Sequence, residues 1–92
     1  MNSIVLKIEQ LLSHEMNIQH IDIIDDSHKH RNHKKDTQGG HYRLFLVSDY
    51  FENMNLIDRH KVIYNILDSM IKTEIHALSM KLLTPSEYQK IS

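Results

Sequence analysis

Apolar and polar residues follow two different periods in the first part of the chain. In the segment SIVLKIEQLLSHEM (3–16), apolar residues recur at spacings of three and four, which is typical of an amphipathic helix. From about residue 18 to 26 the period shortens to two, with Ile21 and Ile23 on one side and polar residues between them. We therefore predict a helix at 3–16 followed by a half-buried strand at 18–26.

A second strand is predicted at 41–49, where HYRLFLVSD is rich in aromatic and aliphatic residues. Gly39 and Gly40 precede it and can adopt positive φ angles. A hairpin with a long, irregular loop is therefore expected to connect the two strands. A short extra turn is expected near 50–55.

The segment from Leu56 to Lys72 has the longest helical pattern. On a helical wheel, Leu56 and most other apolar residues cluster on one side, while charged residues fall on the other. Arg59 and His60 lie within the apolar arc. They are expected either to be buried and paired or to act in function, and for His60 we favour burial with a hydrogen bond to a neighbouring backbone group.

The C-terminal part predicts a third strand and a short helix. The strand covers TEIHALSMKLL (73–83), and there His76 shares a face with three apolar residues, Leu78, Met80 and Leu82. The next segment, TPSEYQKI (84–91), opens with Thr84 and Glu87 at capping-box spacing and a proline at the first helical position. The order α-β-β-α-β-α predicts one small α+β domain over residues 1–92, with helices on one face of a three-stranded sheet.

Composition narrows the class of protein. The 92 residues are 40% hydrophobic and 25% charged, and no apolar run is long enough to span a bilayer. The N-terminus does not have the pattern of a signal peptide, so we expect a cytoplasmic protein with no membrane association. The chain has no cysteine, which excludes disulfides, a thiolate nucleophile and thiolate metal ligands of its own.

Two classes of function receive little support from the residues. The sequence contains no nucleophile elbow, phosphate-binding loop or HExxH motif, so we expect no enzymatic activity. The net charge of −1 gives no overall attraction to nucleic acid, and only local basic patches could bind it.

One local patch is the run DDSHKHRNHKKDTQGGH (25–41), which holds half of the chain's eight histidines. It allows three interpretations: a metal site, a nucleic-acid contact or a solvated polar loop. Basic side chains in such a run would add affinity for phosphates that does not depend on sequence.

The segments DIIDDSHKH, HYRLFLVSDYF, LIDRHKVIYNIL and IHALSMKLLTPSEY together resemble the BolA family of small proteins. The most specific signals are an RH-[RK]-x-[VI]-Y helix start and a [VI]-HAL strand. The resemblance implies the fold α-β-β-α-α-β-α with a mixed sheet, related to the type II KH fold, and adds a short second helix. The chain departs from the family at ENMN, which lacks a common glycine, at Lys61, which replaces a frequent arginine, and in its slightly longer loop.

For metal binding, the residues alone favour a packed or half-exposed ring at His76, whereas the resemblance implies a ligand. BolA-like proteins use the histidine of the HAL motif to share a [2Fe–2S] cluster with a monothiol glutaredoxin. The second ligand comes from the loop, where Ser27 to His30 matches S-x-x-H. His30 is therefore the predicted ligand, with His33 and His28 as fallbacks. A glutaredoxin cysteine and a glutathione thiolate would complete the set, so the isolated chain, a monomer or weak homodimer, is expected to hold no cluster.

The family is also described as DNA-binding transcriptional regulators, which gives an alternative function with DNA as the partner. A helix-turn-helix-like element would cover residues 52–71, although no GxxG loop is present and Asp58 and Asp68 would repel phosphate. The predicted nucleic-acid contacts are basic side chains of the loop and of this element: Lys29, Arg31, Lys34, Lys35, Arg59 and Lys61.

Overall fold

The computed structural model describes residues 3–27 and 40–92. Within these ranges the elements are α1 (Ser3–Glu15), β1 (His20–Asp25), β2 (Gly40–Val47), the 3-10 helix η2 (Asp49–Phe51), α2 (Leu56–Ile66), β3 (Ile75–Leu83) and α3 (Pro85–Ile91). The order confirms the predicted α+β class, and η2 stands where the resemblance implied a short second helix. None of the helices in the described ranges is long and apolar enough to cross a membrane.

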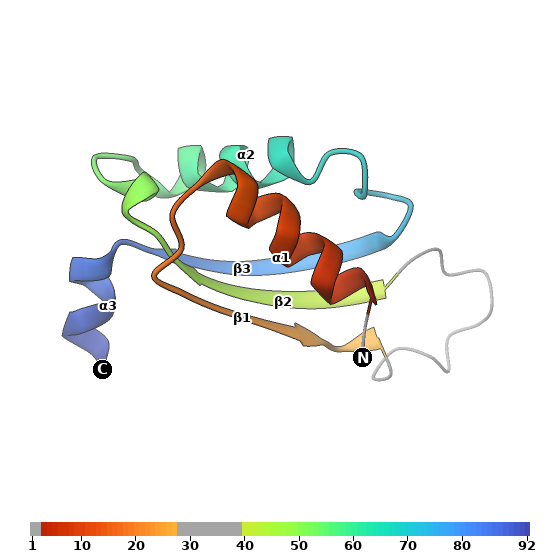
Figure 1. Cartoon of the computed structure of the whole chain (residues 1–92), viewed down its shortest axis with the longest axis horizontal. Coiled ribbons are helices and arrows are strands. Elements are labelled where there is room, and N and C mark those ends of the chain that lie inside the picture. Colours follow the sequence, from red (N-terminus) through yellow and green to blue (C-terminus); the bar gives the residue numbers. More distant parts are fainter. Residues whose placement is uncertain (1–2, 28–39) are drawn as a thin grey trace.

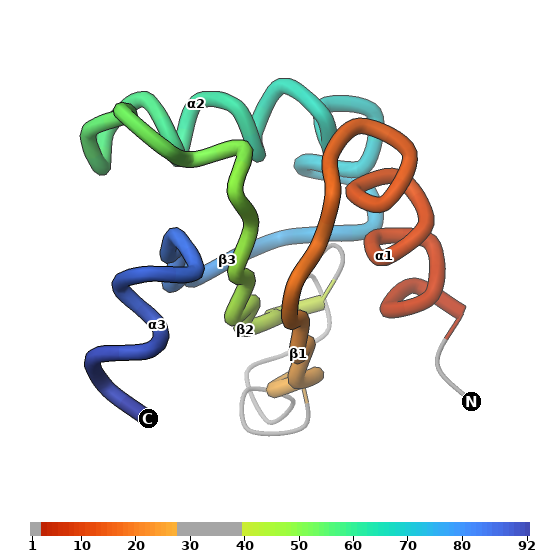
Figure 2. The backbone as a smooth tube through the Cα atoms, turned by 60° about the vertical axis from the view of Figure 1, so that its left-hand side comes forward, coloured from red at the N-terminus to blue at the C-terminus, as the bar shows by residue number. Residues whose placement is uncertain are grey.

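The strands of the described residues form one mixed sheet in the order β1-β2-β3. β1 pairs with β2 in antiparallel orientation, and β3 pairs with β2 in parallel orientation. Helices α1 and α2 cover one face of this sheet (Figures 1 and 2). The other face is here called the open face, and its side chains are His20, Asp22, Ile24, His41, Arg43, Phe45, Val47, Ala77, Ser79, Lys81 and Leu83.

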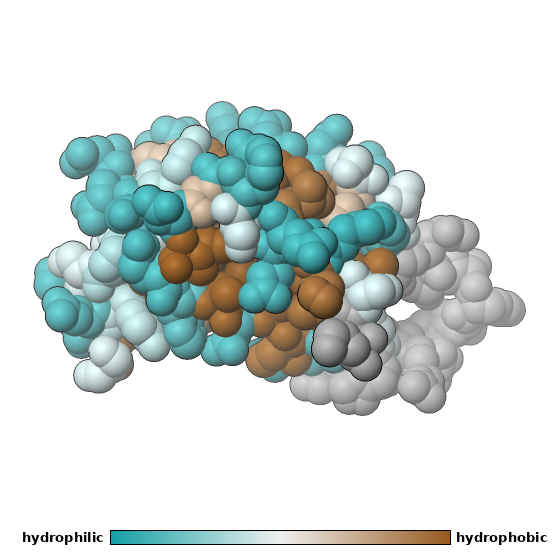
Figure 3. All heavy atoms as spheres, in the orientation of Figure 1, coloured by the Kyte–Doolittle hydropathy of each residue, from teal (hydrophilic) through white to brown (hydrophobic). Residues whose placement is uncertain are grey.

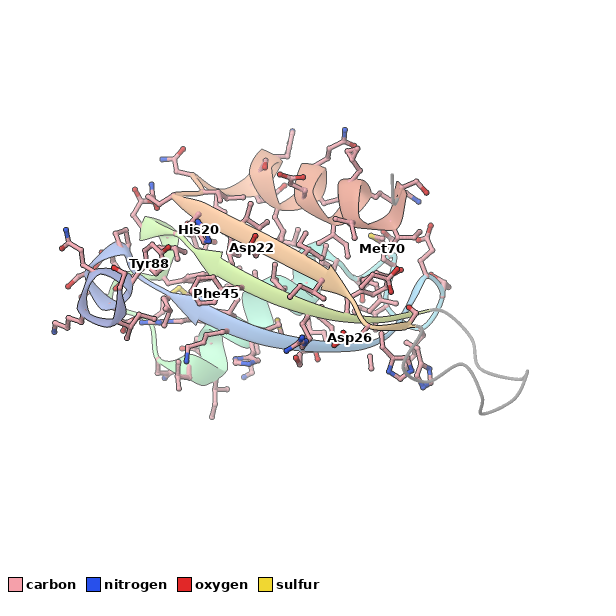
Figure 4. The ribbon with its side chains drawn as sticks, turned by 90° about the horizontal axis from the view of Figure 1, so that it is seen from below. His20, Asp22, Asp26, Phe45, Met70 and Tyr88 are labelled. Carbon is pink, nitrogen blue, oxygen red and sulfur yellow. The ribbon has the colours of Figure 1, made fainter. Side chains whose placement is uncertain are left out.

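Helix α3 lies at one end of the sheet (Figure 1). Its Tyr88 stacks on His20 with ring centroids 5.2 Å apart and meets Phe45 edge-on at 5.7 Å. Figure 4, which views the sheet from below, shows these three residues together at that end. α3 therefore reaches the end of the open face, in contrast to α1 and α2, because the chain leaves β3 at that end and the tyrosine ring finds apolar surface there.

The hydrophobic core lies between the sheet and its two covering helices. Ile8 and Leu12 of α1, Leu46 of β2 and Ile63 of α2 are all fully buried. Burying a side chain of this size contributes about 1.5–3 kcal/mol each, which explains why these two helices dock on the same face. On the side seen in Figure 3, apolar residues gather along β1 and beside α1, while the outer surfaces of α2 and α3 are mainly hydrophilic.

The long helix is shorter than the predicted 56–72, because α2 ends at Ile66. The chain continues in hydrogen-bonded turns, in which the Met70 N–H donates to the Leu67 carbonyl at 2.8 Å, and Lys72 has a φ of 74°. These turns keep Leu67 and Met70 buried, so they preserve the apolar pattern of a helix. No glycine or proline marks the C-terminal end of α2, so the helical-wheel pattern could not predict where the helix stops.

The start of α2 also differs from the prediction. Leu56 was placed on the apolar side, yet it is 63% exposed, and Ile57 beside it is 67% exposed. The buried stripe begins only at Arg59, whose side chain takes the first core-facing position of the helix. The first turn of α2 therefore displays apolar side chains to solvent.

The strands are also shorter than predicted. The observed bounds are 20–25, 40–47 and 75–83, against the predicted 18–26, 41–49 and 73–83. β2 ends before Ser48 because the hydroxyl of that residue accepts a hydrogen bond from the Tyr50 N–H at 3.1 Å and so caps η2.

Candidate metal-binding site

A β-bulge places His76 on the open face. Between Gly40 and His41 the chain of β2 advances one residue, while its partner β3 advances two, from Ile75 to Ala77. His76 is the extra residue, and a bulge of this kind redirects a side chain. Ile75 is buried whereas His76 is exposed. His76 was predicted to share a face with Leu78, Met80 and Leu82. That prediction is wrong, because the bulge interrupts the period of two.

The bulge brings two imidazole rings together. His41 of β2 and His76 of β3 have ring centroids 5.1 Å apart, and their planes are inclined at 53°. The rings come from strands that are adjacent in the sheet but are separated by 35 positions in the sequence (76 − 41). The predicted metal set omitted His41, since only the bulge makes it a neighbour of His76. Its position at the start of the second strand was the one available signal.

Backbone contacts from the end of β1 hold His41 in place. The hydroxyl of Ser27 accepts a hydrogen bond from the His41 N–H at 3.1 Å, and the Asp26 N–H donates to the His41 carbonyl at 2.7 Å. A Cβ at Gly40 would lie 2.5 Å from the Ser27 hydroxyl oxygen. Gly40 thus permits this close approach, and it does not use the positive φ that a glycine can adopt.

An ion pair and a hollow adjoin His41. The carboxylate of Asp26 lies 2.7 Å from Nε of Arg43, and its side chain is only 14% exposed. Figure 4 shows Asp26 at the end of the sheet away from Tyr88. A hollow of about 200 Å³ is lined by six residues of this end of the sheet, Asp26, His41, Tyr42, Arg43, Ala77 and Ser79. The open face therefore has room beside His41 for a group from another molecule.

The remaining predicted ligands cannot be compared with this geometry. His28, His30 and His33 lie outside the described residues, as do the predicted phosphate contacts Lys29, Arg31, Lys34 and Lys35. The segment that contains them starts after Ser27 and ends before Gly40, the two residues that flank the backbone of His41. Within the described ranges, histidines and carboxylates form no group of three or more that could hold a metal ion.

Arg59 is a buried structural cation. It is 5% exposed, and its guanidinium donates to the Leu82 carbonyl at 2.9 Å and the Met54 carbonyl at 3.0 Å. Two further bonds, of 2.7 and 3.2 Å, reach the carboxylate of Glu87. The expectation that Arg59 is buried and paired is confirmed. Its contact with nucleic acid stays a prediction, although these four hydrogen bonds engage most of its donors, whereas Lys61 is exposed.

The pairing with Arg59 changes the acidity of Glu87. Hydrogen bonds from the guanidinium, and from the Thr84 backbone N–H, lower the pKa of Glu87 from 4.5 to about 2. His60 makes a more local contact, with Nδ1 2.8 Å from the carbonyl oxygen of Leu56. The expected backbone hydrogen bond of His60 is thus confirmed, although its ring is half-buried and not fully enclosed.

Comparison with known proteins is consistent with this architecture. A protein of Buchnera aphidicola that carries no functional name is 37% identical over 83 residues, covering 90% of this chain and 78% of its own. The DNA-binding transcriptional regulator BolA of Haemophilus influenzae is 33% identical over 82 residues, covering 89% and 78%.

A solved structure has the same fold. The BolA domain of SufE1 from Arabidopsis thaliana superposes with a TM-score of 0.82 at 33% identity, covering 95% of this chain and 98% of that one. The family model described as BolA-like protein matches residues 12–87. The chain therefore belongs to the BolA-like protein family.

Proposed function

We propose that this protein binds a monothiol glutaredoxin and shares a [2Fe–2S] cluster with it, in iron–sulfur cluster trafficking or iron-linked regulation. His76 would be one ligand, and a histidine of the loop would be the other, with His30 as the predicted residue and His33 and His28 as fallbacks. A cysteine of the glutaredoxin and a glutathione thiolate would complete the four ligands. The cluster is then cargo held between two proteins.

The observation that carries the proposal is the exposed imidazole of His76. The bulge turns it out of the core at the end of the sheet where the histidine-rich segment leaves and rejoins it. Neutral imidazole nitrogen is an established ligand of [2Fe–2S] iron, where two histidines replace two cysteines. Because the sequence contains no cysteine, imidazole is the donor that this chain can offer to such iron.

The proposal is tested by mixing the protein with a cluster-loaded monothiol glutaredoxin. We expect a heterodimer on size-exclusion chromatography and a change in visible absorption and circular dichroism. His76→Ala should abolish the spectral change. His14→Ala is the matched control, because the His14 side chain is 83% exposed at the end of α1 and should leave the spectrum unchanged. An unaltered spectrum with the unmodified chain would contradict the proposal.

A second candidate function is DNA-binding regulation, which the name of the Haemophilus influenzae relative favours. In the described part of the chain, the exposed predicted contact is Lys61 of α2, and Asp58 in the same helix and Asp68 beyond its C-terminal end are also exposed. These carboxylates oppose phosphate binding at that surface.

This candidate predicts that promoter-sized DNA is retarded by the free protein in a gel and that affinity falls steeply with salt. A defined promoter should compete better than heparin, and Lys61→Ala should weaken binding and reduce the salt slope. Equal, weak binding to every polyanion would count against a regulatory role.

A further inference from the structure

We infer that the middle of the open face binds a nucleoside monophosphate, with the planar base against Phe45 and the phosphate between Arg43 and Lys81. The inference goes beyond the proposed function, because it concerns a different ligand and a site nearer the middle of the sheet than His76. It is carried by one hollow in the open face and by the side chains that line this hollow.

The hollow has a volume of about 280 Å³. Two adjacent rows of side chains on the open face line it, and each row takes one side chain from each of the three paired strands. The first row is Asp22, Phe45 and Lys81, and the second row is Ile24, Arg43 and Ser79. Because small-molecule pockets start at about 300 Å³, the hollow has room for one small ligand.

The ring of Phe45 is supported by two neighbouring rings. His20 makes a T-shaped contact with it at a centroid distance of 5.5 Å, and Tyr88 makes a similar contact at 5.7 Å. Figure 4 shows these three residues together, with Asp22 beside Phe45. A ring that is already packed loses little conformational freedom when a ligand stacks on it. Since every nucleic-acid base can stack on an aromatic side chain, Phe45 is suited to hold the base.

Two cations provide the charge that a phosphate needs. Lys81 is exposed and forms no ion pair with any residue that the structure describes. Arg43 contacts Asp26 through Nε at 2.7 Å, yet its side chain is 54% exposed. Because a guanidinium has five N–H donors, this contact leaves donors for a ligand. Ser79 is paired with Arg43 and lies on the same side of β3 as Lys81, so its hydroxyl can donate to the same phosphate.

The charges around the hollow favour a single nucleotide over a nucleic-acid strand. Asp22 stands in the row of Phe45, and Asp26 lies toward the other end of the sheet (Figure 4). A chain of phosphates running along the sheet would therefore meet a carboxylate in each direction, whereas one phosphate between Arg43 and Lys81 would not. Oδ2 of Asp22 lies 3.2 Å from Nε2 of His20, which leaves Oδ1 to accept a hydrogen bond from a ribose hydroxyl.

The test is a chemical-shift titration of the full chain with adenosine monophosphate, ribose phosphate and adenosine. Adenosine monophosphate should move the amide signals of the two rows, and each part-ligand should bind at least about tenfold more weakly, because it lacks one of the two main contacts. Lys81→Ala should weaken adenosine monophosphate by about tenfold. Lys90→Ala removes the same charge from the exposed last turn of α3 and should leave the affinity unchanged.

A variant of the ring separates ligand binding from a structural role. Phe45→Leu keeps an apolar side chain but removes the stacking surface, so it should weaken adenosine monophosphate by about tenfold and leave ribose phosphate unchanged. Lys81→Ala changes an exposed residue, so the test remains decisive even if Phe45→Leu unfolds the chain.

Three results would overturn the inference. The first is equal affinity of Lys81→Ala and the unmodified chain for adenosine monophosphate. The second is inorganic phosphate binding as tightly as adenosine monophosphate, which would reduce the site to a simple anion contact. The third is tighter binding of a single-stranded oligonucleotide at equal nucleotide concentration, which would make the open face a strand-binding surface.

Discussion

Arg59 of α2 and Glu87 of α3 form a two-point ion pair, with nitrogen–oxygen distances of 2.7 and 3.2 Å. The same guanidinium bonds the carbonyls of Met54 and Leu82 and lies 5.7 Å from the centre of the Phe51 ring. One side chain therefore connects the turn before α2, the end of β3 and the start of α3. A planar group with five donors can do this, and an ammonium group cannot.

Replacing Arg59 should be strongly destabilising. In Arg59→Ala the Leu82 and Met54 carbonyls and the Glu87 carboxylate lose their partner, and breaking such a pair costs about 3–5 kcal/mol when it is buried. Because the Glu87 side chain is 43% exposed, we expect a loss of about 2–4 kcal/mol in the free energy of unfolding by urea. Arg59→Lys should restore less than half of the stability that is lost in Arg59→Ala. Lys61→Ala, on the exposed side of the same helix, should change stability by no more than about 0.5 kcal/mol.

The Glu87 pair also predicts how stability depends on pH. The pKa of Glu87 falls from 4.5 to about 2 in the folded protein, so below pH 4.5 the unfolded chain binds a proton that the folded chain does not. The stabilisation is complete above about pH 4.5 and is lost as the pH falls toward 2. Thermal unfolding of Glu87→Gln should therefore depend less steeply on pH in this window than that of the unmodified protein. Asp68→Asn, which removes an exposed carboxylate, should keep the steep dependence.

Gly40 should resist substitution because of Ser27. A methyl group at position 40 would lie 2.5 Å from the Ser27 hydroxyl and 2.9 Å from the Tyr42 ring. Overpacking of this kind costs about 1–3 kcal/mol, so Gly40→Ala should lower the free energy of unfolding by that amount. In a Ser27→Ala background the cost should be smaller, since one of the two clashes is removed. A double-mutant cycle measures the difference, and an equal cost in both backgrounds would show that the two residues do not interact.

The sequence predicted the elements better than it predicted their contacts. The capping box at Thr84 and Glu87 is present as expected, because both partners lie within four residues of each other. The wheel also placed Arg59 correctly in the apolar arc. That Glu87 would be its partner could not be read from either pattern, since the two residues meet only after β3 returns the chain to α2.

The candidate site shows the same limit. His76 could be singled out from its motif, but its face was predicted wrongly because a bulge adds one residue to the register between β2 and β3. The same bulge creates the contact with His41, so both errors have one cause. Periodicity along one strand carries no information about register with its neighbour, and that register decides which histidines meet.

A last prediction concerns how α3 is attached. α3 has only seven residues, too few to be stable alone, so it depends on its cap and on its contacts with the sheet. The Thr84 hydroxyl accepts from the Glu87 N–H at 3.1 Å, while the Glu87 carboxylate accepts from the Thr84 N–H at 2.8 Å. Thr84→Ala removes the first bond and should cost about 1–2 kcal/mol. Thr84→Ser keeps the hydroxyl and should cost clearly less.

The loss should appear first as local opening of α3. Tyr88 stacks on His20 at 5.2 Å, so the ring protons of His20 experience the field of the tyrosine ring. In Thr84→Ala the proton chemical shifts of His20 should move toward those of an unstructured peptide, and amide exchange in α3 should accelerate more than in β2. Uniformly faster exchange in α3 and β2 would mean instead that the cap stabilises the whole domain as one unit, because α3 would then detach only when the sheet unfolds.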